Sequence, residues 1–244
     1  MIAKVSAATV RHRHLVLVLG LLVAAANAAT LGFAPTLGPR LARPLFVLAL
    51  AALVLGVIVM GVRPAYFVVQ PQIPAFATPG PAWTVFFALG FLGPASAHLG
   101  ALVRSTRQDT LSTFDVVIDV GWIVLAALAV ARAWRAHGVR LHPYGLRQTG
   151  TLDSLTLPWE ALRAPKIPPP ADRPSWLRMS VAEPQLVVRR GIPWSRMALR
   201  TDNVDAGFLA AVIGHYVSHP EHRAAIGSQV EYERLRAELP ERDA

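Results

Sequence analysis

The chain has 244 residues, a formal net charge of +9 and no cysteine, and only 16% of its residues are charged. A soluble domain of average composition carries about 25% charged residues, so a large part of this chain is expected to lie outside water. The lack of cysteine excludes disulfide bonds, thiolate catalysis and cysteine-ligated metal or iron–sulfur centres.

The charges are unevenly distributed along the chain. Residues 1–135 contain ten Lys/Arg against three Asp, whereas residues 136–244 contain fourteen Lys/Arg against twelve acidic residues. The excess positive charge therefore falls around apolar segments, where arginine anchors helices and meets anionic lipid headgroups. Because the C-terminal part is nearly balanced, we expect no binding to nucleic acid.

Long apolar runs dominate the N-terminal part, and a membrane-crossing helix needs about 20 largely apolar residues. The predicted spans are about 15–33, 44–62, 82–103 and 114–134. The fourth is the least regular, because Asp115, Asp119 and Arg132 fall inside it. We predict a membrane all-α bundle of about four transmembrane helices over residues 15–135, in contact with the lipid bilayer, after an N-terminal tail at residues 1–14.

The distribution of Lys and Arg predicts an orientation in the cell (inner) membrane. With both termini cytoplasmic, the inner loops and ends hold seven basic residues and the outer loops four. A second interpretation makes the N-terminus a cleaved signal peptide, because a basic start precedes an apolar stretch and the small-residue site Ala26-Asn27-Ala28. Cleavage would leave three spans and the same side for the C-terminal part.

The connection at residues 63–81 contains five prolines. Proline removes a backbone donor and clashes with the preceding helical turn, so this segment cannot form a long helix. We predict an irregular linker that lies against the bilayer surface or the bundle.

Three ionisable residues at membrane depth form a candidate site, because such groups are costly in lipid. Asp115 and Asp119 share one helix face at the spacing i, i+4. A short loop at residues 104–113 would bring His98 to a similar depth as Asp119. The group could relay protons or bind a cation. Alternatively, Asp115 caps its helix while His98 and Asp119 form a hydrogen-bonded packing pair.

The C-terminal part is predicted to be a soluble α+β domain. Residues 138–150 are typical of a hairpin with its turn at residues 143–145. Further short strands are expected at 154–159, 176–181, 185–189 and 197–200. An apolar stripe then predicts a helix over 204–218 with Asn203 as its cap. A second helix is expected from Glu221 to about Leu239, with a possible break at Gly227.

Several short motifs in this region resemble a known family. They are Leu141-x-Pro143-x-Gly145-Leu146-Arg147, Leu157-Pro158-Trp159-Glu160, Phe208-Leu209-Ala210-Ala211 and His215-Tyr216-Val217 with His219-Pro220-Glu221-His222-Arg223-Ala224-Ala225-Ile226-Gly227. The first two resemble bacterial pleckstrin-homology-like domains, and the last two are similar to actinobacterial multi-pass membrane proteins of that type. The resemblance covers about residues 137–235. It implies a cytoplasmic pleckstrin-homology-like domain at 136–220, followed by a C-terminal helix and tail at 221–244, and it implies no defined activity.

Two groups of side chains in this domain are candidates for binding. The basic residues Arg147, Arg189, Arg190 and Arg196 form a possible contact for lipid headgroups or a partner, or simply a solvated surface. His215 and His219 are spaced i, i+4, a spacing that can bind one metal ion from a helix, with His222 as a third candidate. Because Pro220 is expected to break the helix before His222, and His219 can act as a cap, we predict no metal site.

The leading functional hypothesis is a membrane protein that presents its cytoplasmic domain to a protein partner as a scaffold or interaction module. We assign no reaction, no catalytic residue and no cofactor. The alternative is a small transporter or membrane-embedded catalyst that uses His98, Asp115 and Asp119.

Overall fold

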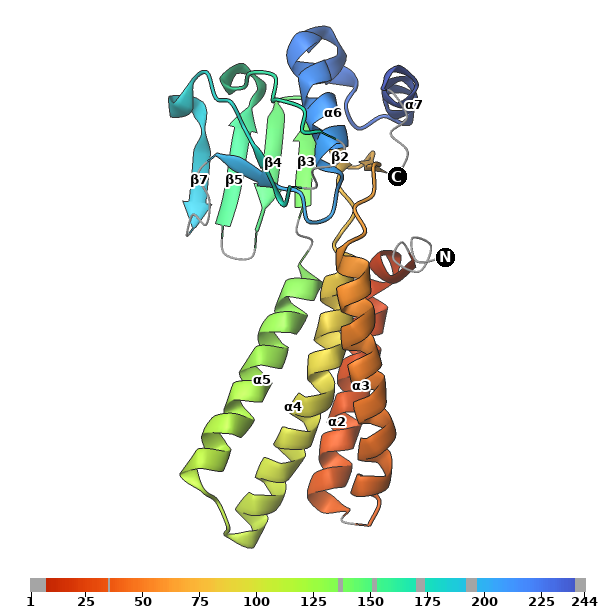
Figure 1. Ribbon diagram of the computed structural model, residues 1–244, viewed down its shortest axis with the longest axis vertical. Helices are drawn as coiled ribbons and strands as arrows, with labels where there is room; N and C mark the ends of the chain where they lie inside the picture. The colour runs from red at the N-terminus through yellow and green to blue at the C-terminus, as the bar shows by residue number, and fades with distance from the viewer. Residues whose placement is uncertain are drawn as a thin grey trace. The chain divides into compact units, whose positions relative to one another are not determined.

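The structure is a computed structural model, and it describes residues 8–34, 36–135, 138–150, 153–169, 174–191 and 197–239 (Figure 1). The chain divides into two compact units. The first, which we call the helical unit, comprises Met1–Gly61 and Pro81–Arg135. The second, the strand-rich unit, comprises Val62–Gly80 and Ala136–Ala244.

The helical unit contains the helices expected from the apolar runs. They are α2 (Arg13–Phe33), α3 (Gly38–Met60), α4 (Ala82–Gln108) and α5 (Thr113–Trp134). Among the described residues, these are the four helices that are long and apolar enough to cross a membrane. The prediction of four helices long and apolar enough to cross a membrane is therefore confirmed, and α5 forms a continuous helix in spite of the two aspartates near its start.

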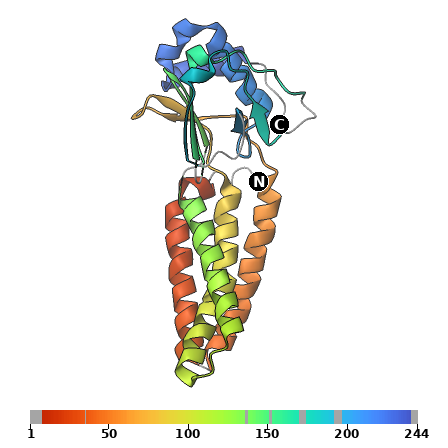
Figure 2. The same cartoon turned by 90° about the vertical axis from the view of Figure 1, so that its left-hand side faces the viewer.

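Helix α4 packs against each of the other three helices, and the four run side by side in both views (Figures 1 and 2). The guanidinium of Arg132, near the end of α5, lies 5.3 Å from the ring centroid of Trp83 at the start of α4. Val59, at the end of α3, packs with Phe86 of α4. The end of α3, the start of α4 and the end of α5 therefore share one end of the bundle. The chain connections between the two units all start from that end of the bundle.

Glycines of α4 allow this close packing. A Cβ atom at Gly90 would lie 2.4 Å from Leu53 Cγ on α3. A Cβ atom at Gly100 would lie 2.9 Å from the carbonyl oxygen of Ala28 on α2, which is a backbone atom and cannot rotate away. Small residues at such contacts are the usual means by which membrane helices approach closely.

Gly100→Ala is therefore expected to destabilise the helical unit by about 1–3 kcal/mol, because the added methyl group forces α2 and α4 apart. The matched control is Gly121→Ala in α5, where a Cβ atom meets nothing within 4 Å. Thermal unfolding of the full chain in one detergent, followed by far-UV circular dichroism, measures the difference. Equal melting temperatures for the two variants would contradict the prediction.

The strand-rich unit contains an antiparallel sheet of six strands in the order β1-β2-β3-β4-β5-β7. The strands are β1 (Val68–Gln70), β2 (Ala75–Ala77), β3 (Gly138–His142), β4 (Gly145–Thr149), β5 (Asp153–Pro158) and β7 (Val188–Gly191). Two more strands, β6 (Trp176–Arg178) and β8 (Ala198–Arg200), form a separate pair. The predicted hairpin is present as β3 and β4, with Leu141 opposite Leu146. Of the strand expected at 185–189, the first part is instead a short 3₁₀ helix, η2 (Pro184–Leu186).

The segment predicted as an irregular linker at 63–81 is part of this sheet. It forms the β1–β2 hairpin, and Phe76 of β2 lies opposite Leu141 of β3 and is fully buried. The linker prediction is therefore wrong. Proline excludes a long helix but leaves room for strands of three residues between the prolines. The partner that joins β2 to the rest of the sheet is a strand more than 60 residues further along the chain. The strand-rich unit accordingly includes 62–80, which the sequence-based division placed in the membrane region.

Helices complete the strand-rich unit. They are η1 (Trp159–Ala161), α6 (Ala206–Ser218), η3 (Pro220–Ala225) and α7 (Gln229–Glu238). The helix expected at 204–218 is present as α6, but its cap is Asp205, whose Oδ1 accepts a hydrogen bond from Phe208 N at 2.7 Å. Asn203 instead donates to Thr78 Oγ1 at 3.1 Å, which ties the start of α6 to the β1–β2 segment. The helix expected from Glu221 to about Leu239 is present in two parts, the 3₁₀ helix η3 and the α-helix α7, and the chain breaks between them at Gly227 as expected.

One hydrophobic core holds the strand-rich unit together. The alternating inward residues of the sheet, among them Leu141, Leu146 and Leu157, pack with α6 residues such as Leu209 and Ile213. Figure 1 shows α6 beside these strands. The core therefore joins the two parts of the chain, 62–80 and 138–239, that form this unit.

Candidate functional site

Within the helical unit, the structure brings two of the predicted polar residues together. His98 Nδ1 on α4 lies 2.6 Å from Asp119 Oδ1 on α5. Asp119 is buried, whereas His98 is half-buried and its ring is nearly parallel to that of Trp122, with the centroids 5.7 Å apart. The contact gives each of these polar side chains a hydrogen-bond partner, which lowers the cost of placing them at membrane depth.

Asp115 does not join this pair. It is exposed in the first turn of α5, where a carboxylate interacts favourably with the positive end of the helix dipole. A second buried polar contact lies between α2 and α4, where Asn27 Nδ2 donates to Ser96 Oγ at 2.8 Å. Neither residue was a sequence candidate. Asn27 carried a signal as the one strongly polar side chain of the first apolar run, but nothing local distinguishes Ser96.

One groove of the helical unit is apolar. Helices α2, α4 and α5 enclose a groove of about 580 Å³, with walls that include Leu21, Ala24, Leu92, Ala126 and Val130. Neither His98 nor Asp119 lines this groove. Its surface suits hydrocarbon and offers little to a polar solute.

The predicted basic residues of the strand-rich unit are divided between the two faces of the sheet. Strand pairing places Arg147 opposite Thr156, which in turn lies opposite Val188. Side chains alternate along a strand, so Arg190 lies on the same face as Val188 and therefore as Arg147. Arg189 lies opposite Leu155 and so belongs to the other face. The fourth candidate, Arg196, lies outside the described residues.

A basic residue that the sequence analysis missed lies on the face of Arg147. Arg140 on β3 is directly opposite Arg147 on β4, and both alternate with buried leucines. We call this surface the basic sheet face. It consists of Arg140, Arg147 and Arg190 with the hydroxyl residues Thr149, Ser154 and Thr156. Two like charges directly opposite each other destabilise a strand pair, so this arrangement is not one that sheet stability favours.

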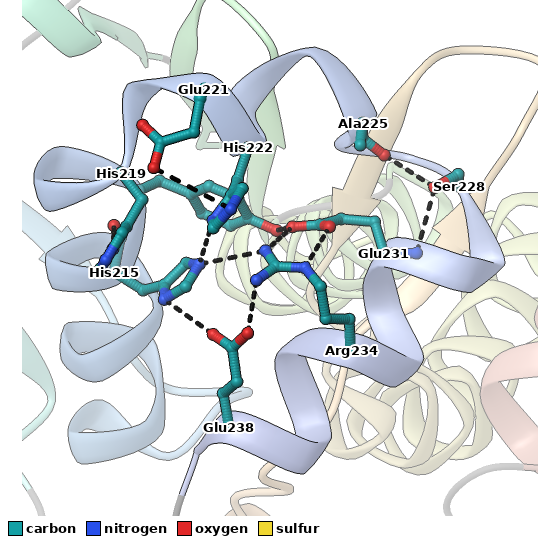
Figure 3. A network of polar contacts seen from close by, with 10 residues as sticks. His215, His219, Glu221, His222, Ala225, Ser228, Glu231, Arg234 and Glu238 are labelled. Atoms are coloured by element: carbon teal, nitrogen blue, oxygen red, sulfur yellow. Dashed lines mark hydrogen bonds and ion pairs between the residues drawn. The ribbon is translucent and has the colours of Figure 1, made fainter.

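The three histidines of the C-terminal motif form a cluster (Figure 3). His222 Nδ1 lies 3.2 Å from His215 Nε2. Each of the three rings offers one nitrogen, and these three nitrogens lie within 4.8 Å of one another. As predicted, α6 ends before Pro220. The break does not keep His222 away from the other two histidines, because the 3₁₀ turn of η3 brings the chain back beside α6.

The second nitrogen of each ring faces an oxygen. His215 Nδ1 lies 3.5 Å from Glu238 Oε2 on α7, and His219 Nδ1 lies 3.0 Å from the carbonyl oxygen of His215. His222 Nε2 lies 4.0 Å from Glu221 Oε1. Burial lowers the pKa of His215 more than the nearby Glu238 raises it, which favours the neutral imidazole.

A buried ion pair supports the cluster from α7. Arg234 donates to Glu231 from Nη2 at 2.7 Å and from Nε at 2.8 Å, and Tyr216 Oη donates to Glu231 Oε1 at 2.9 Å. Burial alone would raise the pKa of Glu231, but these hydrogen bonds favour the carboxylate and leave that pKa below its usual value. Arg234 Nη2 also lies 3.2 Å from His215 Nε2. The sequence analysis did not single out this pair, because Glu and Arg three residues apart are common on any exposed helix.

Comparison with known proteins identifies no relative: no family model matches this chain, and no curated protein and no solved structure is significantly similar to it.

Proposed function

We propose that the chain is a membrane-anchored interaction module in the cell (inner) membrane. Its four apolar helices supply the anchor, and its strand-rich unit supplies the surface that binds a partner protein. In this proposal the strand-rich unit is a cytoplasmic pleckstrin-homology-like domain that carries out no reaction. The excess of Lys and Arg in the inner loops supports the orientation, and the antiparallel strands followed by α6 support the domain type.

The observation that carries the proposal is the basic sheet face. The guanidinium groups of Arg140, Arg147 and Arg190 lie on one face among hydroxyl side chains. The positions of β3, β4, β5 and β7 that point to this face carry no acidic residue. Guanidinium groups offer paired donors that match carboxylates and phosphates. The face is therefore complementary to an anionic partner.

The width of this face favours an extended acidic segment over a single phosphate group. Neighbouring strands are about 4.8 Å apart, so the three strand spacings from β3 to β7 separate Arg140 from Arg190 by at least about 14 Å. One headgroup can contact the opposed pair Arg140 and Arg147, but it cannot reach Arg190 as well. A protein segment with several carboxylates can contact all three. Beside it, β7 forms one edge of the sheet and all four of its residues are exposed, which leaves space for such a segment.

The alternative, a small transporter or membrane-embedded catalyst built on His98, Asp115 and Asp119, has less support. Asp115 lies apart from the other two, and the groove described in the helical unit is apolar and does not include the His98–Asp119 pair. A pathway for a polar solute needs polar groups along its walls. A hydrogen-bonded packing pair accounts for the geometry of His98 and Asp119.

Charge reversal on the two faces tests the proposal. The full chain in detergent is titrated with a fluorescent oligoglutamate peptide at low salt. Arg190→Glu is expected to weaken binding by about tenfold, because it replaces an attraction by a repulsion within the proposed contact. The matched control is Arg189→Glu, which makes the same change in charge one residue away on the opposite face and is expected to have a much smaller effect.

Equal weakening by both variants would mean that only net charge matters and would refute binding at the basic sheet face. Vesicles that contain anionic lipid are the second probe. If Arg190→Glu impairs binding to vesicles but leaves peptide binding unchanged, the partner is a lipid surface and the proposal of a protein partner is wrong.

A further inference from the structure

We propose that His215, His219 and His222 bind one divalent transition-metal ion, with Zn²⁺ as the foremost candidate. Imidazole nitrogen is a preferred ligand of zinc and of its neighbours copper, nickel and cobalt. The proposed site is independent of the basic sheet face, since it lies at the C-terminal end of α6 and in η3.

The spacing of the ring nitrogens fits a common ion. Zinc binds imidazole nitrogen at about 2.0–2.1 Å with tetrahedral geometry, which places two such nitrogens about 3.3 Å apart. His215 Nε2 and His222 Nδ1 are 3.2 Å apart, and the ligand atom of His219 lies within 4.8 Å of both. The rings of His215 and His222 are nearly parallel, at 13°, so both rings must rotate before they can bind one ion.

The surroundings of the rings select which nitrogen faces the ion. Metal-binding histidines almost always donate their second ring N–H to a carboxylate or a backbone carbonyl, which fixes the tautomer. Here, Nδ1 of His215 faces Glu238 and Nδ1 of His219 faces the carbonyl oxygen of His215. The Nε2 atoms of these two rings then carry the lone pairs that can bind the ion. For His222 the arrangement is reversed, with Nδ1 toward His215 and Nε2 toward Glu221.

Arg234 is the competing cation at this site. Its Nη2 lies 3.2 Å from His215 Nε2, on the nitrogen that the ion needs. The same guanidinium is held by Glu231 at 2.7 Å and Glu238 at 2.5 Å, so it can give up the imidazole contact and keep both ion pairs. These two carboxylates also offset the repulsion between the guanidinium and the ion. Binding therefore exchanges one cation for another on His215.

The location of the site indicates what the ion does. Its ligands come from the last turn of α6, the residue after it and η3, and Glu238 on α7 orients one of them. A bound ion would therefore fasten three consecutive elements to one another. Three protein ligands leave one coordination position open, and His219 is exposed, so the ion can exchange with the solvent. These properties suit a site that stabilises the C-terminal region in response to available metal.

The test uses the full chain, purified in detergent with an affinity tag that contains no histidine. Zinc content after dialysis and the visible absorption of the Co²⁺-loaded protein report binding and coordination geometry. The wild type is expected to hold about one ion with the strong absorption of tetrahedral Co²⁺. His219→Gln and His222→Gln are each expected to weaken Zn²⁺ binding by at least about tenfold. The control is His12→Gln, which removes an exposed imidazole from the helical unit.

Two variants of α7 test the role of Glu238. Glu238→Gln is expected to weaken Zn²⁺ binding by about 10–100-fold, because the carboxylate no longer orients His215. Glu233→Gln removes an exposed carboxylate from the same helix, one that accepts a hydrogen bond from Gln229, and is expected to bind as the wild type does. Far-UV circular dichroism of each variant establishes that the fold is retained.

Either of two results would overturn the proposal. One is a wild type without tetrahedral Co²⁺ absorption, and the other is unchanged Zn²⁺ affinity in folded His219→Gln and His222→Gln. In both cases the cluster would be a stacked group of imidazoles held by Arg234 and Glu238 alone.

Discussion

Replacing Trp159 by alanine is expected to destabilise the strand-rich unit by about 3–5 kcal/mol, the usual cost of removing a large buried aromatic side chain. Trp159 is 1% exposed, and its ring packs against that of Tyr216 with the centroids 5.7 Å apart. Its Nε1 donates to the carbonyl oxygen of His142 at 2.9 Å, which links η1 to the end of β3. The variant therefore loses packing and leaves a carbonyl oxygen without its donor.

A second variant separates these two contributions. Trp159→Phe keeps most of the ring packing but removes the hydrogen bond, so its expected cost is about 1–3 kcal/mol. The control is Trp176→Ala, at a tryptophan that is 36% exposed on β6. Pulse proteolysis of the full chain across a urea series measures unfolding of this unit in detergent. A Trp159→Ala midpoint equal to that of Trp176→Ala would show that Trp159 is not central to the core.

Gly227→Ala is expected to destabilise the strand-rich unit by about 2–4 kcal/mol. Gly227 has φ of +98°, a conformation that costs other residues about 1 kcal/mol. A Cβ atom there would also lie 2.4 Å from the backbone nitrogen of Ala75 and 2.6 Å from the carbonyl carbon of Pro74. Both are main-chain atoms at the start of β2, so the clash forces the turn before α7 away from the β1–β2 hairpin.

The matched control is Gly214→Ala, in the middle of α6. A Cβ atom there meets nothing within 4 Å, and alanine is the better helix former, so this variant is expected to stabilise the unit by about 0.5–1 kcal/mol. The same urea series measures both. The expected changes in the free energy of unfolding have opposite signs for the two substitutions. A loss of stability in both would contradict the open space around Gly214.

Local patterns in the sequence were sufficient to predict the elements that a long apolar run, a turn motif or a helical period of apolar residues defines. The four membrane helices follow from apolar runs of about 20 residues, because the bilayer thickness fixes that length. The β3–β4 hairpin follows from its turn residues, and α6 follows from its apolar stripe. Sequence reasoning also brought His98 close to Asp119, because residues at similar distances from a short loop between two antiparallel helices lie at similar depth.

Only the tertiary structure decided the features that depend on distant pairing. Residues 62–80 look like a linker because proline excludes a helix. Strand β2 nevertheless pairs with β3, although α4 and α5 lie between the two strands in the sequence. The basic sheet face arises from strand register. The register pairs Arg140 with Arg147 and places Arg190, rather than Arg189, on their face of the sheet. A short stretch of sequence does not contain this information. The histidine cluster depends on the direction in which the chain turns after Pro220. Propensity and hydropathy are local, so the sequence by itself determined the elements, and long-range packing decided which side chains meet.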